Sequence, residues 1–332
     1  MRLQIVNERT VDVFDPELLR QVMVDHADAL IRWERGTEVF AEGLGQSVPV
    51  TEGAVWQRQR RMLMQAFTPR RLAGYVAQMV EATTQGLTPQ RSGEQAMDSL
   101  FSHLAMDVIS RTMFGEDSDT ALSAPEVFDQ CLLSFQAGHE TTATALLWWS
   151  WLMACHPQAQ ARAAAEIDAC LAGQAPGADA MQALPWLSAT LKEAMRLFPP
   201  VAALMTRRLP RDIELAGVRL PARTLVRVTP WLLHRDPRWW PREPDAFRPE
   251  RFMAATDDWQ PDPIPRGAYI PFGLGPRVCL GQHFAQLEMT VIAALLLQRF
   301  RLSTLSDTAP TPLLAVTLRP AGGVRLMLAA RP

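Results

Sequence analysis

Apolar and polar residues alternate at the start of the chain and then take up a helical period. The stretches RLQIV and RTVDVF alternate and are rich in β-branched residues, which predicts a pair of strands within residues 1–15. A helical pattern covers residues 16–30, and Pro16 occupies the favoured first position of a helix. Further helical patterns cover residues 53–67, 70–87 and 97–114, and a polar loop is expected at 115–125.

The longest helical pattern spans residues 126–155 and ends before Pro157. Shorter helical patterns cover residues 158–171, 184–197 and 280–299. Frequent prolines and short alternating pieces between 201 and 265 predict small strands, and a strand pair is expected around AGG near the C-terminal end. We therefore expect a mainly α fold with a minor β-sheet in one domain, residues 1–332. It would comprise a β-rich part at about 1–15, a helical core at about 16–200 and 280–300, and a loop- and strand-rich region at about 201–279.

Composition narrows the function classes. The chain has 332 residues, of which 48% are hydrophobic, and a net charge of −2, which argues against a nucleic-acid partner bound through bulk charge. The most apolar run, residues 143–155, is too short to span a bilayer, and the first residues lack an apolar signal core. We therefore expect no membrane anchor. The four cysteines form no CxxC pair, which favours a cytoplasmic location.

One cysteine stands on a glycine-rich turn, FGLGPRVCLG, just ahead of a predicted helix. Gly273 and Gly275 permit a tight turn that can approach a flat ligand closely. Free amides and the positive end of the helix would stabilise a thiolate at Cys279, and Arg277 can pair with a carboxylate. The alternative is a structural cysteine on an ordinary loop. The full pattern F-x-x-G-x-R-x-C-x-G is expected by chance in roughly one chain in ten thousand of this length, which favours the functional interpretation.

This turn resembles the haem-binding loop of the cytochrome P450 family, in which a cysteine thiolate holds the haem iron. The resemblance implies that Cys279 is the metal ligand and that Arg277 pairs with a haem propionate. It also implies that the amides after the cysteine temper the thiolate. The residues that the resemblance places around the haem at this loop are Pro271, Phe272, Gly273, Arg277, Cys279, Leu280, Gly281 and Ala285.

A second family motif is the E-x-x-R pair formed by Glu193 and Arg196, which share one helical face. By itself this spacing is more typical of a surface ion pair, which contributes little. The sequence PERF follows at 249–252, however, and the resemblance implies a buried charged triad of Glu193, Arg196 and Arg251. Its role would be to support the cysteine loop, not to take part in the chemistry.

The stretch AGHETT at 137–142 resembles the family's oxygen-activation segment. A threonine hydroxyl in a helix can bond back to a preceding carbonyl and loosen the local ladder. The resemblance implies that Ala137 lies against the haem and that Glu140 and Thr141 relay protons. The alternative is a polar patch on a helix face. We do not expect His139 to ligate iron.

Two more segments carry expected propionate partners. Trp56 and Arg60 have W-x-x-x-R spacing, so both face one direction from their helix and can donate to a carboxylate; a core tryptophan with an exposed arginine is the alternative. The family places another arginine five residues before an acid, which favours Arg207, paired in sequence with Asp212. Arg208 is the competing choice.

The chain is shorter than the family pattern in one internal place. Trp56 and Ala137 are 81 positions apart, whereas the resemblance implies roughly 140 to 170 there, a difference beyond ordinary loop variation. Only residues 118–125 lie where the family has the helices that roof the substrate pocket. We therefore expect these lid helices to be missing and the distal haem face to be open to solvent. The leading helix of the family is also expected to be absent.

Three functions remain open at this point. The first is a haem-thiolate oxidoreductase of P450 type, which oxidises a small hydrophobic molecule with electrons from a separate ferredoxin or flavoprotein, or with peroxide. The second is a minimised haem-binding scaffold with an open distal face and little native monooxygenase activity, peroxidase-like or a sensor. The third is a haem-free helical interaction protein.

Overall fold

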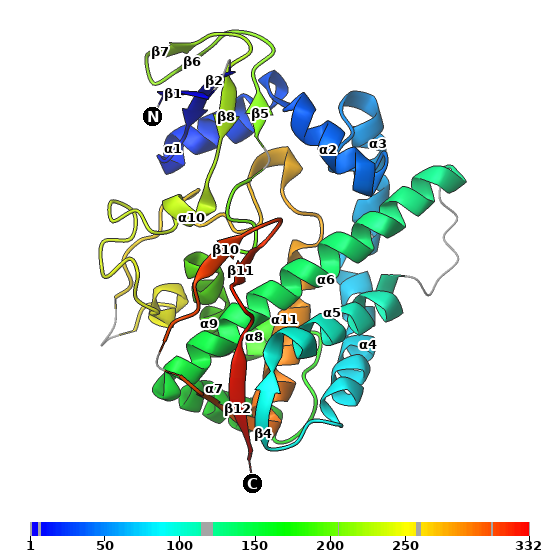
Figure 1. Cartoon of the computed structure of the whole chain (residues 1–332), viewed down its shortest axis with the longest axis vertical. Coiled ribbons are helices and arrows are strands. Elements are labelled where there is room, and N and C mark those ends of the chain that lie inside the picture. Colours follow the sequence, from blue (N-terminus) through cyan, green and yellow to red (C-terminus); the bar gives the residue numbers. More distant parts are fainter. Residues whose placement is uncertain are drawn as a thin grey trace.

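The computed structural model describes residues 2–5, 8–113, 122–204, 206–256, 260–306 and 308–331. Helices predominate in this part of the chain and gather at one end of the molecule. A small sheet with its connecting loops forms the other end (Figure 1). The prediction of a mainly α fold with a minor β-sheet is confirmed.

The helices are α1 (Pro16–Arg20), α2 (Glu34–Leu44), α3 (Gly53–Leu63), α4 (Pro69–Leu87), α5 (Met97–Met113), α6 (Ala124–Cys155), α7 (Pro157–Leu171), α8 (Ala180–Ala183), α9 (Pro185–Leu197), α10 (Pro230–Leu233) and α11 (Gln282–Arg299). The strands are β1 (Arg2–Ile5), β2 (Glu8–Asp12), β3 (Ile31–Arg32), β4 (Gly93–Ala96), β5 (Arg207–Arg208), β6 (Ile213–Leu215), β7 (Val218–Leu220), β8 (Leu225–Arg227), β9 (Phe300–Thr304), β10 (Pro312–Leu314), β11 (Leu318–Pro320) and β12 (Arg325–Ala330).

The largest sheet has the strand order β1-β2-β8-β5-β3, in which β2 and β8 are parallel and the other neighbours are antiparallel. This order places Arg32 of β3 opposite Arg207 of β5, although the two residues are far apart in sequence. One cluster of buried hydrophobic residues lies beneath this sheet, and a larger one fills the space between the helices. The cysteine turn lies between these two regions.

Local signals account for several helix ends. The Asp15 carboxylate caps α1 by accepting from the amides of Glu17 and Leu18 at 2.9 and 3.0 Å. Ser123 and Glu126 form a capping box at the start of α6, which therefore begins at Ala124 and includes the end of the predicted polar loop. Most of that loop, residues 115–121, lies outside the described residues. Within the described ranges no element stands between α5 and α6.

Several predictions of local structure are wrong. The helix expected at 16–30 ends at Arg20 and continues as a wide turn at Gln21–Asp25 and a tight turn at Ala27–Ala29. The wide turn brings the carbonyl oxygen of Met23 against Gly275, so packing on the cysteine turn overrides the helical pattern. The strands that flank AGG do not pair with each other: β11 pairs with β10, while β12 lies between β4 and β9.

Helices α5 and α6 pack closely side by side (Figure 1). A Cβ added to Gly138 of α6 would overlap the Cδ1 atom of Ile109 on α5, so the two helices approach each other closely at this point. The contact fixes the position of the AGHETT segment relative to the rest of the helical region.

Candidate functional site

The cysteine turn is held by its own backbone. Gly273 and Gly275 have φ values of +83° and +79°, which strongly favour glycine. The amide of Gly273 donates to Ile270 O, and the amide of Cys279 donates to Phe272 O, each at 3.0 Å. A Cβ at Gly275 would also overlap Met23 O. Both glycines are therefore required by the backbone geometry, as the pattern indicated.

The Cys279 side chain is solvent-exposed two positions ahead of Gly281, the residue that caps α11. Burial of the surrounding region raises the pKa of the thiol, whereas a hydrogen bond from the Gly281 backbone and the charge of Arg60 lower it. The net direction is upward, so the helix end alone does not stabilise the thiolate. A coordinated metal ion would supply that stabilisation, because metal binding deprotonates a thiol.

Helix α3 brings Trp56 and Arg60 to the cysteine turn. The Arg60 guanidinium lies 5.9 Å from the Trp56 ring centroid, and the Arg277 guanidinium lies 4.1 Å from the same ring. Burial lowers the pKa of Arg60, and the charge of Cys279 acts in the opposite direction. Trp56, Arg60 and Arg277, which the sequence analysis expected to bind haem propionates, therefore lie close together.

The two candidate arginines of β5 point to different partners. Arg208 forms ion pairs with Glu8 and Glu34, at 2.8 and 2.7 Å. Arg207 is buried, and its Nη1 atom has no hydrogen-bond partner in the described structure. Asp212, which the sequence spacing associated with Arg207, instead binds Arg219. Of the two arginines, Arg207 is therefore the one with an N–H group available to bind a carboxylate.

Trp56, Arg207 and Arg277 line one cavity of about 490 Å³. Its lining also includes Glu52, with apolar surface from Leu30 and Leu274. Cationic and indole donors beside apolar walls suit a ligand that is flat, largely apolar and carboxylated. The unpartnered Nη1 atom of Arg207 is the kind of buried donor that a carboxylate would satisfy. The residues present therefore fit a haem.

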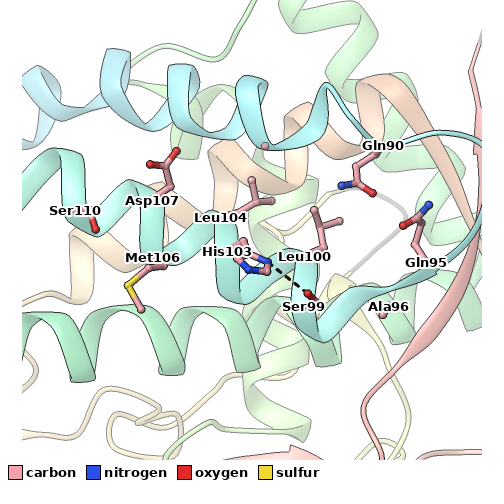
Figure 2. Close-up of a pocket in the computed structure, with 11 residues that line it drawn as sticks. Gln90, Gln95, Ala96, Ser99, Leu100, His103, Leu104, Met106, Asp107 and Ser110 are labelled. Carbon is pink, nitrogen blue, oxygen red and sulfur yellow. Dashed lines mark hydrogen bonds between the residues drawn. The ribbon is translucent and has the colours of Figure 1, made fainter.

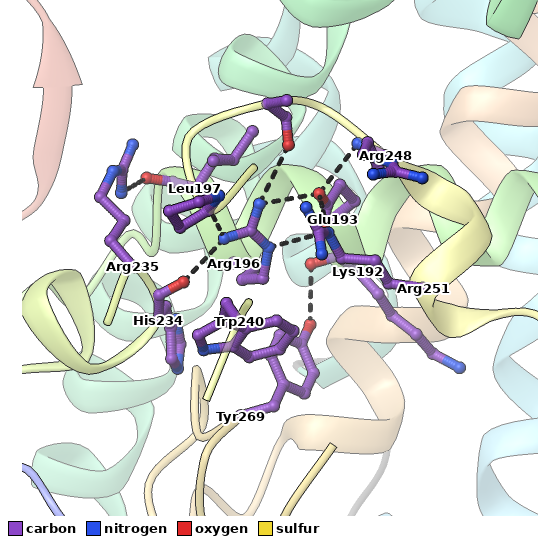
Figure 3. Close-up of polar contacts among 12 residues, drawn as sticks. Lys192, Glu193, Arg196, Leu197, His234, Arg235, Trp240, Arg248, Arg251 and Tyr269 are labelled. Atoms are coloured by element: carbon purple, nitrogen blue, oxygen red, sulfur yellow. Dashed lines mark hydrogen bonds and ion pairs between the residues drawn. The ribbon is translucent and has the colours of Figure 1, made fainter. Parts of the chain in front are cut away.

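The predicted triad is buried and closely bonded (Figure 3). Arg196 donates to both carboxylate oxygens of Glu193, from Nε at 2.7 Å and from Nη2 at 2.8 Å. Arg251 approaches Glu193 at 3.4 Å, and the amide of Arg248 donates to Glu193 Oε1 at 2.9 Å. Both oxygens of a fully buried carboxylate are thus satisfied.

This buried cluster is connected to the cysteine turn. Arg196 Nη1 donates to the carbonyl of His234 at 2.7 Å, and His234 Nε2 accepts from the amide of Ile270 at 2.9 Å. Ile270 in turn accepts from Gly273. Tyr269 donates its hydroxyl to the Lys192 carbonyl at 3.1 Å (Figure 3). Burial and the charge of Arg196 lower the pKa of His234 to about 3, so this imidazole is neutral.

The AGHETT segment lies in the middle of α6, which runs without a break through it. The Thr141 hydroxyl donates to Ala137 O at 2.8 Å, the back-bond that the sequence suggested. The helical ladder is not opened by it, so the expected loosening is not seen. His139 Nδ1 lies 2.9 Å from Phe135 O, as part of the same helix.

Strand β11 binds one face of α6, a relationship that the sequence did not reveal. Thr317 donates to Glu140 Oε1 at 2.8 Å, and Arg319 forms an ion pair with the same carboxylate. Two turns further along, Trp148 donates its indole N–H to Leu318 O at 2.7 Å. Hydrogen bonds from Arg319 and Thr317 outweigh burial, so the pKa of Glu140 is lowered.

A buried carboxylate behind AGHETT also escaped sequence reasoning. Glu288 of α11 is fully buried, accepts from the Thr142 hydroxyl at 3.1 Å, and leaves Oε1 without a partner in the described structure. Burial raises the pKa of Glu288 well above its usual value, which favours the protonated form. The one signal for it is an acid within the apolar run of α11.

A second cavity, of about 600 Å³, lies along α5 near β4 and the end of α4 (Figure 2). Polar side chains line it, among them Gln95, Ser99 and His103, and Ser99 Oγ lies 3.4 Å from His103 Nδ1. None of the residues expected to hold a haem lies there. This cavity is therefore separate from the candidate site.

The model of the cytochrome P450 family matches residues 1–122 and 116–326. The chain belongs to the cytochrome P450 family. Haem with a cysteine thiolate ligand is accordingly its cofactor. The two matched stretches of this P450 meet at 116–122, between α5 and α6, where the spacing predicts that the lid helices are missing.

Curated relatives of this P450 include enzymes from bacteria and plants. Cyclooctatin synthase of Streptomyces melanosporofaciens is 38% identical over 221 residues, 64% of this chain and 46% of that protein. The 11-oxo-beta-amyrin 30-oxidase of Glycyrrhiza uralensis is 34% identical over 239 residues, 72% of this chain and 45% of that protein. The chain thus spans less than half the length of these two relatives.

Solved P450 structures share the fold. CYP175A1 from Thermus thermophilus superimposes with a TM-score of 0.83 at 26% identity, covering 98% of this chain and 91% of that one. A six-coordinated P450 from a second strain of Thermus thermophilus gives a TM-score of 0.81 at 27% identity, covering 96% and 92%. In the described part of this P450, none of the helices has the length and apolar character needed to cross a membrane.

Proposed function

We propose that this P450 is a haem-thiolate oxidoreductase that oxidises a small hydrophobic organic molecule, using oxygen or peroxide. The observation that carries the proposal is that Trp56, Arg207 and Arg277 line one cavity. Arg60 lies beside Trp56, and the accessible sulfur of Cys279 stands two positions after Arg277. These residues come from three separate parts of the sequence, and each has donor or ligand chemistry that a haem requires.

In this proposal Cys279 ligates the iron, and the bound haem supplies the centre at which oxygen or peroxide is reduced. Arg207 and Arg277 pair with the propionates, and Arg60 adds positive charge beside the thiolate. The apolar sides of the site come from residues such as Leu274. The buried cluster of Glu193, Arg196 and Arg251 holds the loop that carries the ligand and does not touch the reacting atoms.

Proton handling is assigned to the middle of α6. Glu140 is an acid with a lowered pKa, so it is ionised at neutral pH and can accept hydrogen bonds from water molecules that carry protons towards the site. Thr141 is the adjacent hydroxyl, one residue along the helix. Their sequence neighbourhood resembles the oxygen-activation segment of the family, and this resemblance supports the assignment.

Electrons would come from a separate ferredoxin or flavoprotein, and peroxide is the alternative source. A single haem domain in the cytoplasm is consistent with four cysteines that form no disulfide. We assign no nucleic-acid partner, given the net charge of −2.

A second candidate is a haem-binding scaffold with an open distal face. It is favoured by the exposure of α6 around the start of AGHETT: Phe135 is 38% exposed, and Gln136 and Ala137 are exposed as well. Water that reaches a haem face competes with substrate and reduces coupling of oxygen reduction to product formation. Peroxide-driven, unselective oxidation would then be the main activity.

The ferrous–carbon monoxide spectrum tests the haem-thiolate assignment. Wild-type protein should give the strongly red-shifted band of a thiolate-ligated haem, and Cys279→Ala should lose it. Cys170→Ala, at an exposed cysteine of α7, is the matched control and should keep the band. Arg277→Ala should weaken haem retention while the remaining haem keeps the band. A red-shifted band in Cys279→Ala would refute the assignment.

The two candidate functions separate on substrate-linked behaviour. Displacement of the distal water by a hydrophobic substrate, with product formed in proportion to the electrons supplied by a donor protein, supports the monooxygenase. Oxidation that needs peroxide and ignores the donor supports the scaffold.

A further inference from the structure

Glu52 is a carboxylate inside the cavity where a haem propionate would bind. It caps α3, four residues ahead of Trp56, and lines the same cavity as Arg207 and Arg277. One carboxylate oxygen forms an ion pair with Arg277, and the other accepts from the backbone amide of Arg32 at 2.9 Å. The side chain is only 36% exposed. A carboxyl group of the protein therefore already binds a cation that the proposed function assigns to the cofactor.

The charges that face Glu52 come from every side of the cavity. Arg32 of β3 approaches it at 3.4 Å, Arg207 of β5 faces it across the cavity, and Arg277 belongs to the turn Gly275–Arg277. Asp28, in the turn Ala27–Ala29, is the other acid that lines the cavity. Burial raises the pKa of Glu52 to about 7, and the charge of Arg207 opposes that shift.

A propionate has the same chemical group as Glu52 and would seek the same guanidinium. Arg207 can accept a carboxylate without giving up a partner, because its Nη1 atom has none in the described structure. Arg277 has fewer donors left for a carboxylate, because it already binds Glu52 and donates to Thr51 O at 3.3 Å. An ionised Glu52 beside a propionate also adds like-charge repulsion, whereas a protonated Glu52 can donate a hydrogen bond.

We propose that Glu52 competes with a haem propionate for Arg277 and thereby limits the affinity of this P450 for haem. The affinity for haem then falls as pH rises. The inference rests on the proposed function, because it requires haem to bind in this cavity. Linkage fixes the sign: a propionate nearby favours the protonated form of Glu52, so haem binding takes up a proton and is strongest at low pH.

Haem loss from the purified holoprotein tests the inference. The rate of haem transfer to excess apomyoglobin is followed by absorbance between pH 6 and 8.5 for wild type, Glu52→Gln and the control Glu38→Gln. Glu38 is an exposed acid of α2, outside the cavity. Wild type and Glu38→Gln should lose haem roughly tenfold faster at the high end, which corresponds to about one unit of pKa coupling. Glu52→Gln should lose haem more slowly at pH 8.5, with little change across the range.

Two outcomes would overturn the inference: faster haem loss from Glu52→Gln than from wild type at pH 8.5, or the wild-type pH slope retained in the variant. Glu52→Ala is a second carboxylate-free variant in case the glutamine protein does not fold, and Glu52→Asp should retain the pH dependence. A wild-type thiolate band with an unchanged slope in both carboxylate-free variants refutes the role of Glu52 alone. Absence of the band in wild type refutes the proposed function instead.

Discussion

The carboxylate of Glu140 on α6 is bound by the guanidinium of Arg319 on β11. Thr317 donates to the same oxygen of Glu140, so one carboxylate joins the middle of the long helix to the C-terminal strands. The pair is partly exposed, with 27% of the Glu140 side chain and 52% of the Arg319 side chain reached by solvent. The acid of the AGHETT segment is therefore held as an anion by residues far from it in sequence.

Arg319→Gln should weaken the pH dependence of stability. The pKa of Glu140 is lowered in the folded protein, so its contribution is present above the unfolded pKa and is lost as pH falls through the folded pKa. Because the pair is exposed, the loss at pH 7 should be under about 1 kcal/mol. Urea unfolding at pH 7 and pH 4 measures it: the variant should differ from wild type at pH 7 more than at pH 4. Equal differences at both pH values would contradict this prediction.

Arg196→Ala should be severely destabilising. Its removal leaves the fully buried carboxylate of Glu193 without its main cation, which typically costs about 3–5 kcal/mol. Arg325→Ala is the comparison, because Arg325 pairs with Glu94 at the exposed surface and should cost under about 1 kcal/mol. The free energy of unfolding of each variant, compared with that of wild type, measures these two losses. Similar losses in both would show that the buried cluster contributes little.

Gly275→Ala should disrupt the cysteine turn. Alanine at a φ of +79° is strained, and its Cβ would overlap Met23 O, so the loss should exceed about 2 kcal/mol. Gly322 provides a control at a φ of +76° with open space around its Cβ, where alanine should cost only about 1 kcal/mol. The melting temperature and the haem content per chain report both effects. Full haem content in Gly275→Ala would argue that the turn tolerates a shift.

His234→Gln should flatten the acid limb of the stability curve. His234 is neutral in the folded protein down to about pH 3, but its unfolded pKa is 6.5. Between these values the unfolded chain binds a proton that the folded chain excludes, so wild-type stability falls as pH drops, by at most about 1.4 kcal/mol per pH unit. The glutamine amide can still accept from the Ile270 amide. Unfolding measured from pH 7 to pH 4 should show a smaller slope for the variant; an identical slope would exclude His234 as the cause.

The spacing of residues in the sequence was sufficient to predict contacts between two side chains of the same helix. Glu193 and Arg196 are three residues apart on one helix, and they form the ion pair that this spacing predicts. The need for glycine at two positions of the cysteine turn could likewise be predicted, because a positive φ is a requirement on a single residue. The order of the family motifs indicated the mainly α fold.

Contacts between distant segments could not be obtained in this way. Arg319 is 179 positions from Glu140, and Glu52 is 225 positions from Arg277, so no periodicity connects them. The strands around AGG illustrate the same limit. Alternation predicted that they exist, but the identity of a strand's partner depends on the packing of β9 against α6 and of β12 against α5.

Lys192, whose carbonyl accepts from Tyr269, is the only lysine in the chain. Burial lowers the pKa of its ammonium group, so a larger share is uncharged and nucleophilic near neutral pH than for an ordinary lysine. An amine-directed fluorophore or crosslinker would therefore meet a single side-chain target. That target adjoins Glu193, so one chemical label would report on the region that supports the cysteine turn without any engineered residue.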